Sequence, residues 1–252
     1  TGRAARRMEE ATQHEAQTIH RLLEFDPKQG GFSRDPSRPL ELDALVVDEC
    51  SMLDLPLARS LLAALPQHAR LVLVGDVDQL PSIGPGAVLR DVIESGRVPT
   101  IRLTEIFRQA AKSLIVDNAH RILEGRAPGS SPKGDPQGDF FLSSADEPAD
   151  AAEKVRQLVV ERIPKTFGLD PVRQVQVLTP MHRGPAGSQA LNQILQASLN
   201  PPRADSPIGL FRSGDKVMQL RNDYQRDVFN GDIGFVTAVE AEGRKVTVDV
   251  DG

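Results

Sequence analysis

The chain has 252 residues, of which 39% are hydrophobic, and a formal net charge of −5 at pH 7. This length suits one large domain or two ordinary domains, and the charge excludes a basic field over the whole molecule, although a narrow basic groove stays open. No apolar run is long enough to span a bilayer, so we expect no membrane partner. Cys50 is the single cysteine, which excludes an internal disulfide and predicts a reducing, cytoplasmic location.

The N-terminal part of the chain alternates between helical and strand patterns. Helices are expected at residues 9–23, 55–65 and 87–95, and strands at residues 42–47 and 70–76. A loop rich in Gly, Pro and Ser separates the first helix from the first strand. The second strand is apolar without alternation, as in a strand covered on both faces. The order strand, helix, strand predicts a parallel sheet with helices on its faces.

A second unit is expected to begin near Ile101. Its elements would be a helix at 113–123, a loop or linker at 128–138, a helix at 149–163, a strand at 175–180 and a helix at 188–199. The tail then changes to short β-rich segments at 215–220, 232–241 and 245–250, with a turn at Asn230 and Gly231. This tail is typical of the start of a small β-barrel.

Two adjacent carboxylates, Asp48 and Glu49, follow the first strand in the stretch "LVVDECSMLD". In open α/β sheets, ligands bind beyond the carboxyl ends of the strands. Magnesium in nucleotide sites takes one or two carboxylates, and an adjacent Glu can deprotonate the attacking water. An apolar strand followed by Asp-Glu is the Walker B pattern of P-loop ATPases. The alternative is a plain surface turn after a buried strand.

The second strand ends in "GDVDQLPSIGPG", which places Asp76 and Gln79 in one tight turn. The amide of a Gln in this position could reach a γ-phosphate and report whether ATP is bound. The alternative is a polar loop closed by prolines and glycines.

In this order, "VVDECSMLD", "LVGDVDQLPSIGPG" and "LTEIFRQ" resemble motifs of superfamily 1 DNA helicases, and the match is closest to the RecD-like (RecD/TraA) branch. "TGRAARRM" resembles motif Ia of that family, and "QTIHRLL" resembles the motif that follows it. "VLTPMHRGPAGSQALNQILQASLNP" and "DKVMQLRNDYQRDVFNGDIGFV" resemble segments of its second lobe, so the resemblance covers nearly the whole chain. Taken together these motifs are specific for this family, although no single motif is.

The resemblance implies an α/β fold with two RecA-like parallel-sheet lobes and the start of a small Src-homology-like β-barrel. The first lobe, truncated at its N-terminus, would span residues 1–102. The second lobe would span 103–212, and the barrel would begin at 213 and continue to 252.

The resemblance also implies roles for single residues in an ATP-dependent motor. Asp48 would hold the Mg²⁺ of Mg-ATP, Glu49 would be the catalytic base, and Gln79 would couple the γ-phosphate to the DNA track. Asp76 would join the nucleotide site, and Arg108 in "FRQ" would be the arginine finger of the second lobe.

The family moves 5′ to 3′ on single-stranded DNA, which would be the main partner here; nuclease-complex subunits or a fused relaxase are further partners. The DNA-binding residues implied by the resemblance are Thr1, Gly2, Arg3, Thr18, His20 and Thr179.

One departure from the family concerns the phosphate loop G-x-x-x-x-G-K-[ST], which is absent from the chain. Both ends look cut, so we interpret the sequence as a piece of a longer protein whose last helicase motif lies beyond residue 252. Without the backbone cradle and the Lys of the phosphate loop, this piece should not hydrolyse ATP well. The alternative function is a non-catalytic RecA-like module that binds nucleic acid or a partner.

Simpler roles stay open for several of these residues. Arg108 could pair with Glu105 or Asp117 on a surface, and His20 could be an ordinary helix-face residue. A basic cluster is formed by Arg3, Arg6 and Arg7. It could bind the phosphates along a nucleic acid, or it could simply be a solvated helix face. The histidines do not have the spacing of metal ligands, so no zinc is expected. Cys50 is interpreted as a small residue that packs after the buried strand.

Overall fold

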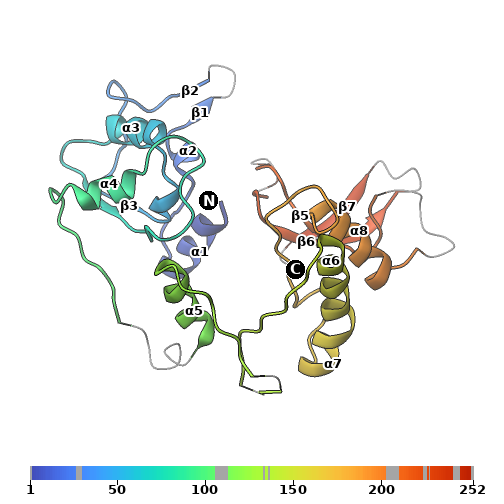
Figure 1. Cartoon of the computed structure of the whole chain (residues 1–252). Coiled ribbons are helices and arrows are strands. Elements are labelled where there is room, and N and C mark those ends of the chain that lie inside the picture. Colours follow the sequence, from blue (N-terminus) through green and yellow to red (C-terminus); the bar gives the residue numbers. More distant parts are fainter. Residues whose placement is uncertain are drawn as a thin grey trace. The chain divides into compact units, whose positions relative to one another are not determined.

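The computed structural model describes residues 2–26, 30–105, 113–132, 134–135, 137–202, 210–223, 226, 228–240 and 245–250 (Figure 1). The chain divides into two compact units, Thr1–Gly129 and Ser130–Gly252. Helices and strands are mixed in both units, and unit 1 contains a parallel strand pair, so the expected α/β class is confirmed at that level. None of the described helices is both long and apolar enough to cross a bilayer.

Unit 1 carries most of the elements expected from its sequence. In chain order these are α1 (Gly2–Thr12), α2 (Ile19–Leu22), β1 (Phe25–Asp26), β2 (Gly31–Phe32), β3 (Ala44–Val47), the 3₁₀ turn η1 (Cys50–Met52), α3 (Leu55–Ala64), β4 (Arg70–Leu73), α4 (Val88–Glu94) and α5 (Leu114–Leu123). The predicted helices at 55–65 and 87–95 and the two predicted strands are confirmed, with bounds that differ by a few residues.

The sheet that positions the candidate site is the parallel pair β3–β4, in which Val47 lies opposite Leu73. One face of this pair packs on a core that includes Leu61 of α3 and Leu89 of α4. Because side chains alternate along a strand, Val46 and Val72 point to the other face, and both are exposed. The prediction that the second strand is covered on both faces is therefore wrong for this chain, since Val72 is 50% exposed.

The single helix predicted at 9–23 is also wrong, because the structure divides this stretch into α1 and α2. Gln13 ends the first helix with a left-handed backbone (φ 57°). Thr18 then caps the second helix, its hydroxyl oxygen accepting the N–H of Arg21 at 3.3 Å. The residues that suggested one apolar helix face, among them Ile19, Leu22 and Leu23, all follow this break and pack in the core, and periodicity alone does not reveal the turn before them.

A short antiparallel hairpin, β1–β2, stands where the sequence indicated only a loop; Phe25 lies opposite Phe32. Its base is held by Glu24, whose carboxylate pairs with Arg34 at 2.8 Å and with Arg38 at 2.9 Å. The hydrogen bond from Arg34 holds the pKa of Glu24 below its usual value. These pairs join residues on both sides of the hairpin, a relationship that a local pattern cannot show.

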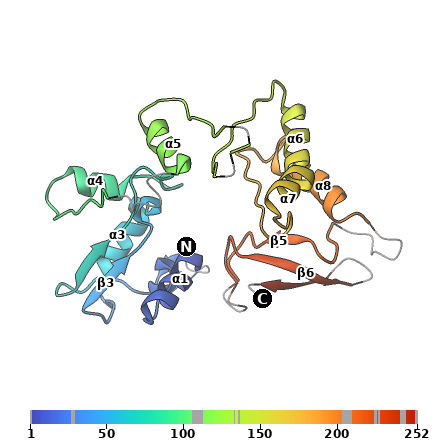
Figure 2. The same ribbon diagram turned by 90° about the horizontal axis from the view of Figure 1, so that it is seen from below.

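Unit 2 consists of helices followed by an antiparallel sheet (Figure 2). The helices are α6 (Pro148–Gln157), the π-helical turn η3 (Leu158–Arg162), α7 (Ile163–Phe167) and α8 (Ser188–Leu199), and the strands are β5 (Lys216–Met218), β6 (Ile233–Val239) and β7 (Val246–Val250). The predicted helices and the β-rich tail are confirmed. The first helix runs on through η3 into α7 and so ends later than predicted.

The strand predicted at 175–180 is wrong. These residues are irregular, and Leu178 is 88% exposed. An apolar run becomes a strand only when a neighbouring strand takes its backbone hydrogen bonds. In the part of unit 2 that the structure describes, the three strands pair with one another and none pairs with this run.

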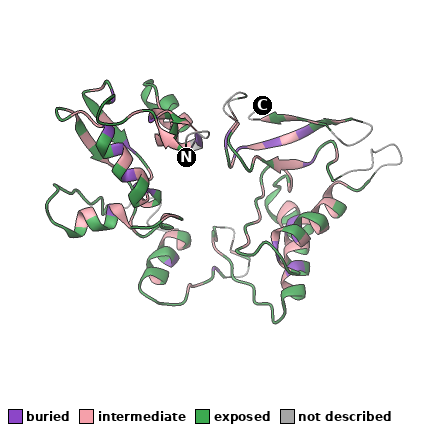
Figure 3. Cartoon of the chain, turned by 90° about the horizontal axis from the view of Figure 1, so that it is seen from above, coloured by how far each residue is buried: buried purple, intermediate pink, exposed green. Residues whose placement is uncertain are grey.

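A buried carboxylate joins α8 to the sheet of unit 2. Asp215 accepts hydrogen bonds from the side-chain amides of Gln196 and Asn200 and from the backbone N–H of Arg212. Val236 and Leu191 are among the buried apolar residues of this unit, and buried positions occur in both units (Figure 3). Because a buried charge is tolerated only when it is fully hydrogen-bonded, Asp215 fixes how the sheet meets α8.

Candidate functional site

The paired acids Asp48 and Glu49 lie directly after β3, where the strand turns sharply into η1. Glu49 has a left-handed backbone (φ 56°, ψ 40°), which is unusual for a residue other than glycine. The carboxylate of Asp48 accepts the N–H of Glu49 at 2.8 Å and so stabilises this turn. Among the described residues other than glycine, Gln13 and Glu24 share a positive φ with Glu49.

The second group of candidate residues lies after β4, at the same end of the sheet. Asp76 accepts the backbone N–H of Asp78 on its carboxylate at 3.0 Å, and the N–H of Gln79 donates to its carbonyl at 3.2 Å. Asp76 and Gln79 are both exposed. The loop therefore presents a carboxylate and an amide to solvent from one tight turn.

The two strand ends are in direct contact. The backbone N–H of Cys50 donates to the carbonyl of Val74 at 2.9 Å, and the N–H of Val74 donates to Val47 at 2.8 Å. Gly75 makes this approach possible, because a Cβ at Gly75 would lie 2.9 Å from the backbone nitrogen of Cys50. The structure thus brings together, at one sheet edge, the turn that carries Asp48 and Glu49 and the turn that carries Asp76 and Gln79.

Cys50 lies beneath this edge and is 1% exposed, in agreement with the packing role expected for it. Its thiol donates to the carbonyl of Val47 at 3.1 Å. Burial, together with a smaller effect of the negative charges of Asp48 and Glu49, raises the pKa of the thiol to about 11. The thiol is therefore neutral at physiological pH and is not a nucleophile there.

The donor set fits a hard cation that takes most of its ligands from water or phosphate. Asp48 is an exposed carboxylate with one oxygen engaged by Glu49, which leaves its second oxygen for a cation. Within the described ranges, no group of three or more His, Cys, Asp or Glu side chains could enclose a metal ion. Magnesium is usually bound by one or two carboxylates together with waters and substrate phosphates, so Asp48 suits Mg²⁺ bound with a nucleotide.

The predicted DNA-binding residues are placed less completely. Gly2 and Arg3 are in α1, Thr18 caps α2, and His20 lies on α2, where its ring packs at 5.6 Å from Phe25. Thr179 belongs to unit 2, where its hydroxyl donates to the carbonyl of Ala186 at 2.8 Å. Thr1 and Arg108 lie outside the described residues, so the expected roles of these two residues remain predictions.

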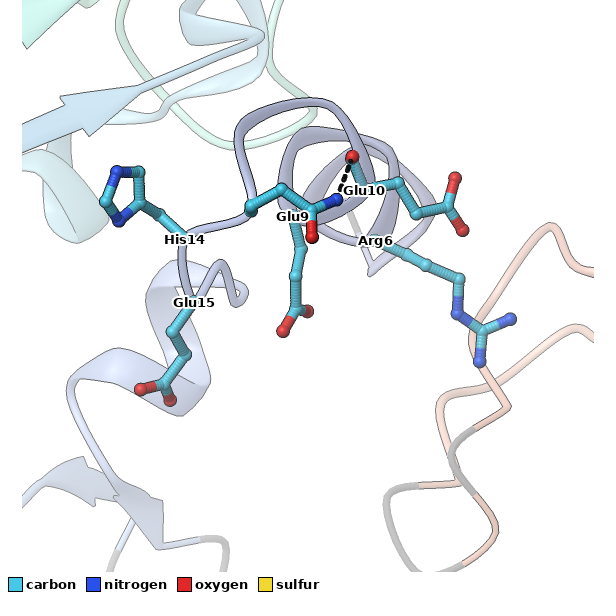
Figure 4. Close-up of a pocket in the computed structure, with 6 residues that line it drawn as sticks. Arg6, Glu9, Glu10, His14 and Glu15 are labelled. Carbon is cyan, nitrogen blue, oxygen red and sulfur yellow. Dashed lines mark hydrogen bonds between the residues drawn. The ribbon is translucent and has the colours of Figure 1, made fainter.

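A separate hollow of about 360 Å³ lies along α1 and the segment after it (Figure 4). It is lined by Arg6, Glu9, Glu10, Gln13, His14 and Glu15. The side-chain amide of Gln13 donates to the carbonyl of Glu10 at 2.8 Å. The carboxylates outnumber the cations in this hollow, which does not suit a phosphate ligand. None of the strand-end residues lines it.

The sequence interpretation missed Ser51, which lies two residues after Glu49 in the chain. Its hydroxyl oxygen is buried and, within the described part of the chain, has no hydrogen-bond partner. A buried polar atom of this kind calls for an explanation such as a ligand or a water molecule. Its place in the stretch "DECS" was the available signal, but the sequence does not show that a Ser in a turn is buried.

Comparison with known families gives two matches. The model of the family described as "AAA domain" matches residues 1–85. The model described as "ATP-dependent RecD-like DNA helicase SH3 domain" matches residues 191–250, which include most of α8 and the sheet β5–β6–β7. The first match contains both strand ends of the candidate site.

The chain is 44% identical, over its whole length, to the ATP-dependent RecD2 DNA helicase of Deinococcus radiodurans, of which it covers 33%. It is 31% identical, over 99% of its length, to the RecBCD enzyme subunit RecD of Mycolicibacterium smegmatis, of which it covers 49%. The chain therefore spans between a third and a half of the length of these relatives.

Among solved structures, the chain is similar to a Pif1 helicase from Bacteroides in complex with ADP-AlF3 and single-stranded DNA. The sequence identity is 16% and the TM-score is 0.41, and the match covers 94% of this chain and 59% of that chain.

Proposed function

Since the chain belongs to the RecD-like helicases, we propose that it is the core of an ATP-dependent DNA helicase or translocase that moves 5′ to 3′ on single-stranded DNA. The observation that carries this proposal is the meeting of two polar strand ends at one edge of a parallel sheet. There, the acids Asp48 and Glu49 lie on one strand end, and Asp76 and Gln79 on the next, joined through Cys50 and Val74. This is the edge at which α/β sheets bind ligands.

In the proposed reaction, Glu49 accepts a proton from the water that attacks the γ-phosphate. Asp48 would hold Mg²⁺, which would neutralise charge on the phosphates. The hydrogen bond from the Glu49 N–H keeps the Asp48 carboxylate in one orientation. The left-handed backbone of Glu49 turns the chain at the end of β3, where both acids lie.

Gln79 and Arg108 complete the proposed nucleotide site. Gln79 is exposed next to Asp76, where its amide is free to turn toward a γ-phosphate. Arg108 would enter from the second lobe when the lobes close on ATP and would stabilise charge that develops in the transition state.

The proposal includes the domain plan and the DNA track. Residues 1–102 and 103–212 would be RecA-like lobes, with 213–252 the start of the barrel. Single-stranded DNA would contact backbone-binding groups at Thr1, Gly2, Arg3, Thr18, His20 and Thr179. Nuclease-complex subunits or a fused relaxase are the further partners of the proposed function.

The decisive experiment measures phosphate release by the full-length protein with and without single-stranded DNA. Strong stimulation by DNA is expected, with DNA binding that weakens steeply with salt and has little base preference. The 252-residue chain, which has no G-K-[ST] sequence, should show no such turnover and serves as the control.

A second candidate function rests on that same missing phosphate loop: a non-catalytic module that uses RecA-like lobes to bind nucleic acid or a partner. A full-length protein that binds single-stranded DNA with normal salt dependence but releases no phosphate would favour the module over the motor.

A further inference from the structure

The loop that follows β4 returns to the N-terminus of α3 and completes its cap. The first N–H groups of a helix have no partner within the helix. In α3, the N–H of Leu55 donates to the carbonyl of Pro85 at 2.9 Å, and the N–H of Leu57 donates to the carboxylate of the N-cap Asp54 at 2.9 Å. Pro56, between them, has no N–H. The loop and Asp54 together therefore satisfy the start of this helix.

Gly84 allows the loop to lie directly against Asp54. A Cβ at Gly84 would collide with the Oδ2 atom of Asp54 and would lie 2.8 Å from its Cγ. All of the closest atoms belong to the Asp54 side chain, which is itself held in place by its hydrogen bond to Leu57. The contact is therefore between a residue without a side chain and a carboxylate that has little freedom to move.

The loop is also held on both sides of Gln79. The hydroxyl of Ser82 shares its one hydrogen between the carbonyls of Gly84 at 2.9 Å and Gly86 at 2.8 Å, which holds the turn that meets α3. At the other end, the guanidinium of Arg90 donates to the carbonyl of Val77 at 3.1 Å. Gln79 lies between these two attachments, so the position of its backbone depends on both.

Asp54 is tied in turn to the acid pair, because only η1 and Leu53 separate it from Glu49. We propose that Gly84 is a positioning residue: because it has no side chain, the loop can lie against Asp54 and hold Gln79 in place relative to Asp48 and Glu49. This inference rests on the proposed function and deepens it.

The test is a double-variant cycle in the full-length protein, with Gly84→Ala, Asp54→Gly and the combination. Gly84→Ala introduces a methyl group where the Asp54 carboxylate lies, so it should displace the Gln79 loop. We expect the DNA-stimulated kcat to fall by about tenfold or more while the KM for ATP changes by less than about threefold. Asp54→Gly removes the colliding atoms and keeps an acceptable N-cap residue, so the combined variant should recover most of the lost kcat.

Gly31→Ala is the matched control, because a Cβ at Gly31 would meet no atom within 4 Å; it should turn over like the wild type. Thermal unfolding of all the variants shows whether each is folded. A wild-type kcat in Gly84→Ala overturns the inference, as does failure of Asp54→Gly to raise the kcat of Gly84→Ala. A wild-type protein without DNA-stimulated turnover would instead overturn the proposed function, and this inference with it.

Discussion

The backbone N–H of Cys50, three residues beyond β3, donates to the carbonyl oxygen of Val74, one residue beyond β4, across 2.9 Å. This bond extends the parallel ladder into the turn that carries Glu49. Because Gly75 leaves no side chain in the way, the turn after β3 and the loop after β4 lie against each other. The predictions below examine this edge and the packing that supports it.

Glu49→Gln in the full-length protein should keep Mg-ATP binding and lose hydrolysis. The change preserves the size of the side chain and removes the base, so kcat should fall by about 10²-fold or more. Steady-state phosphate release and equilibrium nucleotide binding measure the two effects separately. Glu94→Gln, the same change on the exposed last residue of α4, is the control. Weak nucleotide binding with normal turnover per bound ATP would instead assign Glu49 a structural role.

Arg108→Ala in the full-length protein should reduce hydrolysis by about 10³-fold and change ATP affinity far less, because an arginine finger acts on charge in the transition state. Lysine should restore little activity, since it lacks the planar fork of the guanidinium. Arg102→Ala, on an exposed nearby residue, controls for loss of a surface charge. If Arg108 only forms a surface pair, kcat will be unchanged and stability will fall by at most about 1 kcal/mol.

The contribution of Cys50 to the free energy of unfolding should depend on pH. Its pKa is raised by burial from 9.0 to about 11 in the folded chain. The unfolded chain therefore loses the thiol proton at a lower pH than the folded chain, so this contribution is full below pH 9 and is lost as pH rises toward 11.

Urea unfolding of the wild type and of Cys50→Ala at pH 8 and pH 10.5 measures this effect, because other titrating groups are common to both proteins. The stability difference between the two should be smaller at the higher pH. A difference that does not change with pH would contradict the burial of a neutral thiol.

Asn118→Ala should destabilise unit 1 by about 1–3 kcal/mol, the cost of leaving the partly buried backbone N–H and carbonyl of Gly129 without their partner. Asn118 is 1% exposed; its amide donates to the carbonyl of Gly129 at 2.9 Å, and its oxygen accepts the Gly129 N–H at 2.7 Å. Chemical unfolding followed by circular dichroism provides the measurement. Asn192→Ala, on the exposed side of α8, should change stability by less than about 0.5 kcal/mol; equal effects would argue against the paired hydrogen bonds.

Much of the local structure and the candidate site could be predicted from sequence. The helix at Ser188–Leu199 has the predicted bounds, and α3 and α4 differ from prediction by a residue at their ends. The acids at the end of β3 and the Asp76–Gln79 turn after β4 were identifiable because each follows an apolar run. These signals are local: side-chain periodicity, turn residues and motif spacing are all present in a short stretch of chain.

Only the tertiary structure decided which of these local signals are realised and which residues they bring together. The apolar run at 175–180 forms no strand because no described neighbour takes its hydrogen bonds, and the helix predicted at 9–23 breaks at Gln13. The contact of Gly84 with Asp54 joins residues from different loops. Backbone pairing and close packing depend on atoms far apart in the chain, so sequence determined the residues at the strand ends, and folding determined that they share one edge.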